Sequence, residues 1–374
     1  MSEPVKVLQF ICPTGFYGAE RWILTLAKNL DPAKVQCDLA VTVEPNLQEL
    51  ELENQYRLLV GKTHKIEMSG RFDIGVIRRL CNVIRSEGYQ IIHTHGYKSD
   101  ILGLIAARLT GIRALSTPHG FENADDWKLK TYIGLGNQFL KWFDRVAPLS
   151  EQLCEDMRTI GVNQAKVLYI QNGVDLDEVE QHRNDSRALP KTMKRIGFIG
   201  QMISRKNIFD LLDIFDDIAS RHDDVELKLL GDGEQRPELE QYACKLKFKD
   251  RIEFLGFRDD RLDWLKSFDL FVMTSTLEGI PRCLMETMAM GVPVAAYNIA
   301  GIDQLVQHNE TGMLADLGDK QTLTQHWETL IYDAASAERI SANARKYIMD
   351  HFSGKRMAQE YDSLFAEMLV AKRL

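Results

Sequence analysis

Short apolar runs alternate with longer amphipathic segments along the whole chain. Each run is typical of a buried strand, whereas the segments between them repeat apolar residues with a helical period. The predicted strands cover residues 5–12, 38–43, 91–96, 114–121, 145–150, 167–170, 195–200, 225–230, 252–257, 270–273 and 311–314. The predicted helices cover residues 21–30, 71–85, 102–109, 151–160, 208–221, 281–290 and 336–371. This alternation predicts parallel sheets covered by helices, with sites at the carboxyl ends of the strands.

The pattern occurs twice, on either side of a polar segment at 177–194. That segment has no apolar period and is predicted to be a linker. We therefore expect domains at 1–176 and 195–352, each large enough to bury its own core. Strand, glycine-containing loop and helix open both halves, at Val5 and again at Arg195. The predicted fold class is α/β, with two Rossmann-like domains.

Composition places the chain among globular proteins of a reducing compartment. Of its 374 residues, 45% are hydrophobic and 27% are charged, and the formal charge of −8 gives no basic field for nucleic acid. No apolar run approaches the ~20 residues of a membrane span, and the first apolar run lacks the basic region that precedes it in a signal peptide. The six cysteines are scattered without metal-ligand spacing, as in cytosolic proteins.

The most informative stretch has the sequence EGIPRCLMETMAMGVPV. It places Glu278 in a loop, Pro281 at the start of a helix and Glu286 inside that helix. Helical side chains lean toward the amino terminus, so Glu286 reaches the end where the backbone donors near Arg282 and Cys283 favour an anion. Glutamates in a first helical turn are also common because they complement the helix dipole, so these residues alone leave the nature of the site open.

The loop after the first strand contains Gly15 and Gly18. Their spacing is not the G-x-G-x-x-G of dinucleotide-binding loops, and no acidic residue closes the following strand in the dinucleotide manner. A nicotinamide cofactor is therefore disfavoured. The simplest alternative to a ligand-binding loop is a tight turn that needs only flexible residues.

Three histidines fall at the carboxyl ends of predicted strands. His93 and His95 end one strand, and His119 lies in the next. A zinc site is one interpretation, but no carboxylate or thiol lies nearby in the sequence to complete it. A structural role is favoured for His93 and His95.

The spacing of Glu278 and Glu286 resembles the signature of the retaining glycosyltransferases of family 4, which have the GT-B architecture. Further matches are YGAE in the first loop, TPHGF around His119 and NGVD before the linker. The resemblance covers most of the chain. It implies two Rossmann-like domains whose parallel sheets face each other across a cleft, and a last helix, 353–374, that crosses back to the amino-terminal domain.

The resemblance also implies roles for individual residues. Glu278 would lie by the donor sugar, Glu286 would bind the nucleotide ribose, and His119 would lie near the donor sugar and the acceptor. The implied catalytic residues are Glu278, His119 and Lys206, and the implied acceptor contacts are Tyr17, His95 and His119. The implied nucleotide-sugar site comprises Gly15, Gly18, Gln201, Arg205, Lys206, Gly231, Phe257, Arg258, Glu278, Gly279, Ile280, Pro281, Arg282, Cys283 and Glu286.

The second glycine loop departs from the family pattern. The family has an arginine early in this loop and a lysine five residues later, and both neutralise the diphosphate leaving group. Lys206 matches the lysine, whereas Gln201 stands at the position of the arginine. A neutral amide does not grip a phosphate as a guanidinium does, so Arg205 or Arg282 would have to compensate.

No cofactor and no metal ion are expected, because no DxD motif stands at a predicted strand end. The charge of the diphosphate would instead be met by Lys206, a helix amino terminus and the amides of the glycine loops. Such groups stabilise a leaving group electrostatically and need no divalent ion.

The resemblance thus implies a retaining enzyme that moves a sugar from a UDP- or GDP-linked donor to a glycan or lipid-linked acceptor in polysaccharide or lipopolysaccharide biosynthesis. The alternative, motivated by Gln201, is a catalytically weak subunit that binds a nucleotide sugar or a glycan. The segment 127–145 mixes aromatic and basic residues, which suits either a peripheral membrane contact or a covering helix with a basic outer face. The expected location is the cytoplasm, at the inner face of the plasma membrane where that contact forms.

Overall fold

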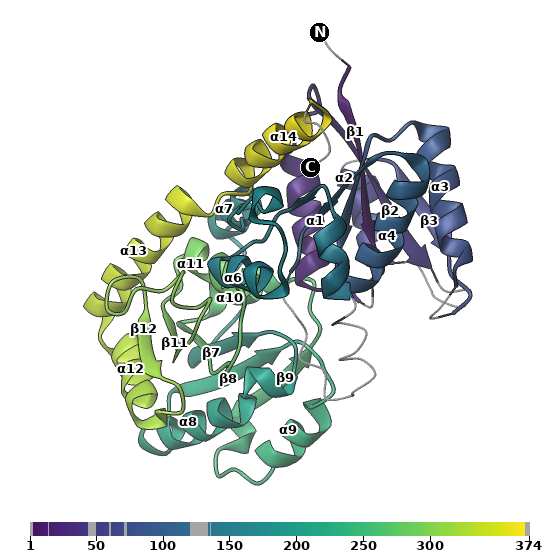
Figure 1. Ribbon diagram of the computed structural model, residues 1–374. Coiled ribbons are helices and arrows are strands. Elements are labelled where there is room, and N and C mark those ends of the chain that lie inside the picture. The colour runs from purple at the N-terminus through teal and green to yellow at the C-terminus, as the bar shows by residue number, and fades with distance from the viewer. Residues whose placement is uncertain are drawn as a thin grey trace. The chain divides into compact units, whose positions relative to one another are not determined.

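The computed structural model describes residues 3–13, 15–43, 50–59, 61–70, 73–119, 134 and 136–370. Its internal contacts divide the chain into two compact units. Unit 1 comprises Met1–Gly173 and Gly354–Leu374, and unit 2 comprises Val174–Ser353 (Figure 1). The amino- and carboxyl-terminal segments of the chain thus belong to the same unit.

Unit 1 is built on a parallel sheet with the strand order β3-β2-β1-β4-β5-β6. The strands are β1 (Val5–Ile11), β2 (Val35–Val43), β3 (Thr63–Glu67), β4 (Ile91–His95), β5 (Arg113–Ser116) and β6 (Arg145–Val146). In β1, Val7 and Ile11 enter the core on one face, whereas Leu8 and Phe10 enter the core on the other. Side chains alternate between the faces of a strand, so burial on both faces explains the continuous apolar run in the sequence.

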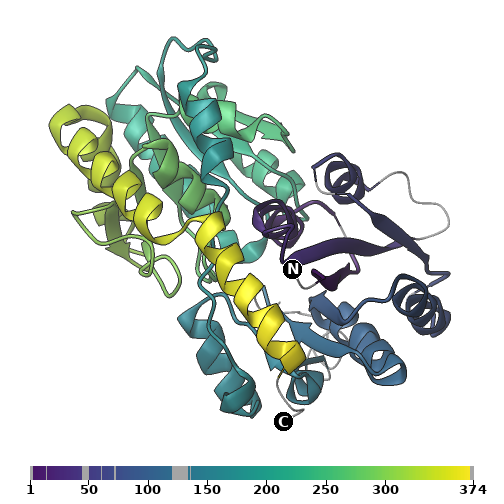
Figure 2. The ribbon, with the colours of Figure 1, turned by 90° about the horizontal axis from the view of Figure 1, so that it is seen from above.

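Helices cover both faces of this sheet. One face packs against α1 (Gly18–Asn29), α2 (Glu51–Leu59) and α14 (Gly354–Val370), and the other against α3 (Gly75–Glu87) and α4 (Tyr97–Thr110). The described part of unit 1 also contains η1 (Leu140–Trp142), α6 (Glu151–Ile160) and η2 (Gln164–Lys166). The last helix, α14, packs against α1, and its course can be followed in yellow in Figure 2.

Unit 2 repeats the plan with the strand order β12-β11-β10-β7-β8-β9, again all parallel. Its strands are β7 (Lys194–Ile199), β8 (Val225–Leu230), β9 (Ile252–Gly256), β10 (Leu270–Met273), β11 (Val294–Asn298) and β12 (Met313–Asp316). One face packs against α8 (Ile208–Arg221), α9 (Arg236–Ala243) and α12 (Lys320–Tyr332). The other packs against α7 (Leu176–Asn184), α10 (Arg261–Ser267), α11 (Arg282–Met290) and α13 (Ala334–His351). Two short helices, η3 (Ser204–Lys206) and η4 (Lys249–Arg251), complete it, and the α/β fold class with two Rossmann-like units is confirmed.

Several elements differ from the predicted ones. The edge strand β3 was not predicted, because its sequence THKIE buries only Ile66 and shows no apolar run. The last predicted helix, 336–371, is two helices, which are separated at Phe352 and Ser353. Phe352 is fully buried, so the chain turns there to place this ring in the core of unit 2.

The segment that was predicted to be a linker, 177–194, begins as a helix. α7 starts after Asp175, whose side chain accepts a hydrogen bond from the Glu178 amide (3.1 Å) and so caps the helix. The helix packs against α10 and α11 of unit 2. Val179 is its one fully buried side chain, which explains why the sequence shows no apolar period there.

Candidate functional site

The loop that follows β10 is tied to the loop that follows β7. The Thr274 hydroxyl donates to the carbonyl oxygens of Lys206 (3.2 Å) and Asn207 (2.9 Å). The Thr276 amide donates to the carbonyl oxygen of Arg205 (2.8 Å). Because β7 and β10 are parallel neighbours, both loops leave the same edge of the sheet. The hydrogen bonds bring the lysine of the first loop against the glutamate of the second.

Lys206 and Glu278 form a buried ion pair through Lys206 Nζ and Glu278 Oε1. Each residue is only 6% exposed. Taking two charges out of water is costly, and their attraction offsets that cost only while both partners are present. The sequence pointed to both residues separately, whereas the structure shows that they neutralise each other at the carboxyl edge of the unit 2 sheet.

The amino terminus of α11 adjoins this ion pair. Pro281 stands at the N-cap position, and no side chain caps the helix by a hydrogen bond there. In its first turn, burial raises the pKa of the Cys283 thiol to about 12, and the charges of Lys206 and Glu278 act on the same thiol. The Cys283 thiol is therefore uncharged. The amino-terminal end of α11 offers backbone donors to an anion beside the ion pair.

The second glutamate, Glu286, is held by two arginines. Arg261 donates from Nη2 to Glu286 Oε1 (2.9 Å) and from Nε to Oε2 (3.2 Å), while Arg282 Nε donates to Oε1 (2.7 Å). The pairing with Arg282 follows from a spacing of one helical turn. Arg261 was not predicted as a site residue, because it lies on another helix and no local pattern signals a partner 25 residues away.

Two glycines let loops of unit 2 approach each other closely. A Cβ atom on Gly301 would lie 1.7 Å from the carbonyl oxygen of Gly279, and one on Gly231 would lie 1.9 Å from that of Gly200. Gly301 and Gly231 also have positive φ angles of 89° and 125°. Both positions therefore require glycine, and they fix the loops that carry the predicted site residues.

The remaining predicted residues of unit 2 lie around this edge with different degrees of exposure. Arg205 is exposed, whereas Gln201 and Ile280 are half-buried. Phe257 follows β9 and is about half exposed. Arg258, beside it, pairs with Asp260 at 2.7 and 2.5 Å on the surface.

In unit 1 the three predicted histidines lie in one cluster. His95 Nε2 is 2.6 Å from Gln9 Oε1, and His95 Nδ1 is 3.0 Å from His119 Nε2. His93 Nε2 is 2.7 Å from the Thr117 hydroxyl, which is 2.8 Å from that of Tyr361 on α14. The histidine rings and Tyr361 all contact the indole of Trp22.

Burial keeps these histidines neutral. It lowers the pKa of His119 to about 3, and burial together with the neighbouring rings lowers the pKa values of His93 and His95 well below 6.5. The amide oxygen of Gln9 only accepts, so His95 donates from Nε2 and accepts at Nδ1 from His119 Nε2. His119 therefore keeps an unprotonated Nδ1.

The acceptor contact predicted for His95 needs correction. His95 is 3% exposed, and both of its ring nitrogens already have hydrogen-bond partners. Its two ring nitrogens are occupied by Gln9 and His119, so it has no polar side-chain atom left for a substrate. The structural role that the sequence favoured for His93 fits its full burial.

The glycine loop of unit 1 leads directly into α1. Glu20 is buried, and its Oε2 accepts from the Tyr17 amide (2.9 Å), so this glutamate caps the helix. Tyr17 itself is exposed, with its ring against Gly15. Gly18 starts the helix, and a Cβ atom there would meet nothing within 4 Å. Gly18 therefore faces open space at the start of α1.

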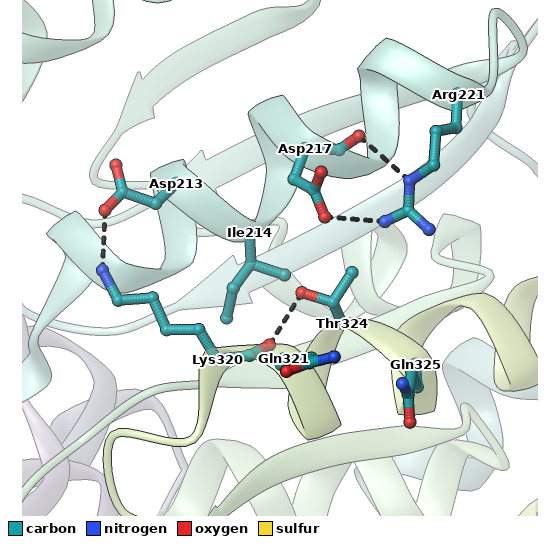
Figure 3. Close-up of a pocket in the computed structure, with 8 residues that line it drawn as sticks. All are labelled: Asp213, Ile214, Asp217, Arg221, Lys320, Gln321, Thr324 and Gln325. Atoms are coloured by element: carbon teal, nitrogen blue, oxygen red, sulfur yellow. Dashed lines mark hydrogen bonds and ion pairs between the residues drawn. The ribbon is translucent and has the colours of Figure 1, made fainter.

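Two further hollows lie away from the predicted residues. A cavity of about 390 Å³ lies between α8 and α12, and its charged side chains pair with each other, as for Lys320 with Asp213 (2.7 Å) and Arg221 with Asp217 (2.7 Å) (Figure 3). A second, of about 400 Å³, lies between α3 and α4 and is lined by Ile74, Ile77, Arg78, Cys81, Asn82, Arg85, Ile105 and Leu109. Neither contains a predicted site residue.

The described part of the chain contains neither a cluster of metal ligands nor a membrane-spanning helix. There, no three histidine, cysteine or carboxylate side chains gather so that they could hold a metal ion. Among the same residues, none of the helices has the length and apolarity needed to cross a bilayer. Of the aromatic and basic segment 127–145, residues 127–133 and 135 lie outside the described residues.

Two Rossmann-like units, each built on a sheet of parallel strands, define the GT-B class of glycosyltransferase folds. The Glycosyltransferase Family 4 model matches residues 16–178, and the Glycosyl transferases group 1 model matches residues 180–347. The chain belongs to this family of glycosyltransferases.

Relatives of known name agree with this assignment. The chain is 28% identical over 318 residues to the UDP-Gal:alpha-D-GlcNAc-diphosphoundecaprenol alpha-1,3-galactosyltransferase of Escherichia coli, covering 80% of this chain and 81% of that protein. It is 22% identical over 315 residues to the capsular polysaccharide biosynthesis glycosyltransferase CapM of Staphylococcus aureus, covering 79% and 82%. Among solved structures, HepE of Anabaena in complex with UDP and glucose superposes with a TM-score of 0.82 at 20% identity, covering 97% and 100%.

Proposed function

We propose that this glycosyltransferase transfers a sugar, with retention at the anomeric carbon, from a nucleotide-diphosphate donor to a glycan or lipid-linked acceptor in polysaccharide or lipopolysaccharide biosynthesis. Unit 2 binds the donor, and unit 1 contributes His119 and the Tyr17 loop to the acceptor. The names of the relatives support this, since one acts on a diphosphoundecaprenol acceptor and another serves capsular polysaccharide biosynthesis.

The observation that carries the proposal is the buried pair of Lys206 and Glu278 at the end of α11. A cation and backbone donors suit a diphosphate leaving group, and a carboxylate beside them suits the sugar that leaves it. Binding of the donor then exchanges the contact between the two side chains for contacts with the ligand. Lys206 stabilises the departing diphosphate, while Glu278 orients the transferred sugar.

The enzyme is proposed to need no metal ion for this step. Lys206, the amino terminus of α11 and the exposed Arg205 supply positive charge and donors to the diphosphate. Arg282 is less suited to replace the arginine that Gln201 lacks, because its Nε is bound to Glu286. Arg205 is therefore the proposed substitute.

Two isosteric changes test the proposal. Glu278→Gln and Lys206→Met should each lower sugar transfer by at least about 100-fold, because each removes a charge that acts on the donor. Each single change also leaves a buried charge without its partner and should cost about 3–5 kcal/mol of stability. The double variant removes both charges and should regain stability without regaining activity. Transfer from UDP- and GDP-sugars and urea unfolding measure the two effects, and full activity in either single variant would refute these roles.

The donor nucleotide is proposed to be a uridine diphosphate, with guanosine diphosphate as the second candidate. The support is the UDP-linked donor in the name of the Escherichia coli relative and the UDP in the HepE complex. A thermal-shift screen of UDP- and GDP-sugars, followed by donor-hydrolysis assays, should show stabilisation by the true donor.

A peripheral membrane contact at the cytoplasmic face is proposed for unit 1. Trp142 is 55% exposed, and its carbonyl oxygen accepts a hydrogen bond from Arg108, next to the exposed Leu109. Exposed aromatic and basic residues of this kind suit an anionic bilayer surface. Sedimentation with anionic vesicles should fall for Trp142→Ser, and equal sedimentation would reject the contact. The alternative of a catalytically weak binding subunit is not favoured, since the named relatives are enzymes.

A further inference from the structure

Arg261, the first residue of α10, is a buried arginine that the assignments above leave without a function. It is 7% exposed, and its guanidinium meets the carboxylate of Glu286 side by side, through Nη2 to Oε1 (2.9 Å) and Nε to Oε2 (3.2 Å). A planar fork that engages both oxygens fixes the plane of a carboxylate as well as its position. A single hydrogen bond, such as the one from Arg282, fixes only one oxygen.

The surroundings of this pair explain why it persists in the interior. Glu286 is 2% exposed, so its charge requires close partners. Arg261 Nη2 also reaches Glu178 Oε1 on α7 (3.3 Å), so two carboxylates and two guanidinium groups alternate across three helices. Burial alone would lower the pKa of Arg261, but the charges of Glu286 and Glu178 raise it above its usual value. The arginine is permanently charged.

A purely architectural role would be to hold α7 and α10 against α11. The geometry supports more than that, because the fork is directed at the carboxylate proposed to bind a ribose. A carboxylate free to rotate about its terminal bond would present its oxygens to a diol only part of the time. The arginine removes that freedom before the ligand arrives.

We propose that Arg261 is a positioning residue that orients the Glu286 carboxylate toward the ribose hydroxyls of the donor nucleotide. This inference rests on the proposed function of the site. It assigns to α10 a share in recognition of a nucleoside diphosphate, although its arginine makes no contact with the nucleotide. A lysine would supply the charge without the fork, so Arg261→Lys separates orientation from neutralisation.

The test compares ribose recognition among variants of the full chain. Calorimetric titration uses UDP and GDP, each beside its 2′,3′-dideoxy counterpart, which lacks both hydroxyls. The unaltered protein should prefer the ribonucleotide by about tenfold or more, the factor expected for one good charged hydrogen bond. Arg261→Lys should lose most of that preference while its affinity for the dideoxy nucleotide stays the same.

Two further variants guard against misinterpretation. Arg195 is a second buried arginine of unit 2, with its Nε 2.7 Å from Glu226 Oε1, so Arg195→Lys should cost similar stability and leave the ribose preference intact. The double variant Arg261→Met with Glu286→Gln removes both charges, which protects folding, and should show no ribose preference.

The outcomes are distinct. A ribose preference that survives Arg261→Lys, or weakening of both nucleotides by the same factor, would show that Arg261 is only architectural. Tight binding of UDP or GDP by the unaltered protein without any ribose preference would also overturn the inference, while leaving the proposed donor class intact. Absence of nucleotide diphosphate binding altogether would overturn the proposed function, and this inference with it.

Discussion

Gln201 stands at the position where the resemblance to the family implies an arginine. It is half-buried in the loop after β7, five residues before Lys206. Gln201→Arg should restore a second cation near the leaving diphosphate and raise kcat/KM for the donor by about tenfold. Steady-state kinetics with varied donor concentration measure this.

The matching change is Arg205→Ala, which removes the proposed substitute. We expect it to lower kcat/KM in the natural chain and to have less effect in the Gln201→Arg background. If the effects of the two changes on kcat/KM were additive, Arg205 would not be acting in place of the arginine that is missing at position 201.

Asp100 gives a prediction about pH. It is buried at the start of α4, where it accepts from the hydroxyls of Thr94 (2.5 Å) and Ser116 (2.8 Å), and burial raises its pKa to about 7. Its pKa in the unfolded chain is near 3.9, so the folded state holds the proton more tightly. The stability due to this residue is therefore greatest at acid pH and is lost as the pH rises from about 4 through 7.

Asp100→Asn lacks this titration. The stability of the variant relative to the natural chain should rise by a few kcal/mol between pH 4 and pH 8. Urea unfolding of both proteins across that range measures the slope, from which any constant packing difference cancels. If the free energies of unfolding of the two proteins changed with pH in parallel, Asp100 would be ionised in the folded protein without loss of stability.

At the scale of elements, the loop that contains Gly301 lies close against the loop that contains Gly279. This close approach should determine whether Glu278 is correctly placed. Gly301→Ala would drive its Cβ into the carbonyl oxygen of Gly279, next to Glu278, and so displace the loop that carries this glutamate. A displacement of about 1 Å at a catalytic group can cost 100-fold in rate, and we expect at least that loss in sugar transfer.

Gly318 provides the control for this change. Its φ of 86° is close to that of Gly301, but a Cβ there would meet nothing within 4 Å. Gly318→Ala should cost about 1–2 kcal/mol from backbone strain alone and leave turnover intact. Equal losses of activity in the two variants would exclude loop crowding as the cause.

Elements were predictable where one stretch of sequence contains the whole signal. The loop and helix from Glu278 to Met290 follow from a proline start and a glycine stop, and the structure has α11 where these predict it. α7 and β3 bury too few apolar residues to show a period. The pairing of Arg261 with Glu286 joins two helices, and the contacts from Gln9 through His95 to His119 join β1, β4 and the segment after β5. Both sets of contacts arise only from the folded chain.

At the scale of the whole molecule, each unit has its own core. Phe365 on α14 lies in the core of unit 1 with Trp22 and Tyr361. Phe365→Ala should destabilise that unit by about 3–5 kcal/mol through the cavity it leaves. Nucleotide binding by unit 2 should keep its affinity, as measured by calorimetry below the unfolding transition of unit 1.

Glu367→Ala, on the exposed side of the same helix, is the control and should change stability by less than about 0.5 kcal/mol. Loss of nucleotide affinity in Phe365→Ala while unit 1 remains folded would show that the two cores are not independent.

The return of α14 to unit 1 has a consequence for synthesis of the protein. A ribosome releases Val174–Ser353 before Gly354–Val370, so the second unit is complete while the first still lacks a helix. The core residues around Trp22 therefore lack the α14 side chains that pack against them while about 180 further residues are translated, at roughly 5–20 residues per second. The nascent chain therefore completes unit 2 first, and unit 1, whose synthesis begins earliest, is the last to be finished.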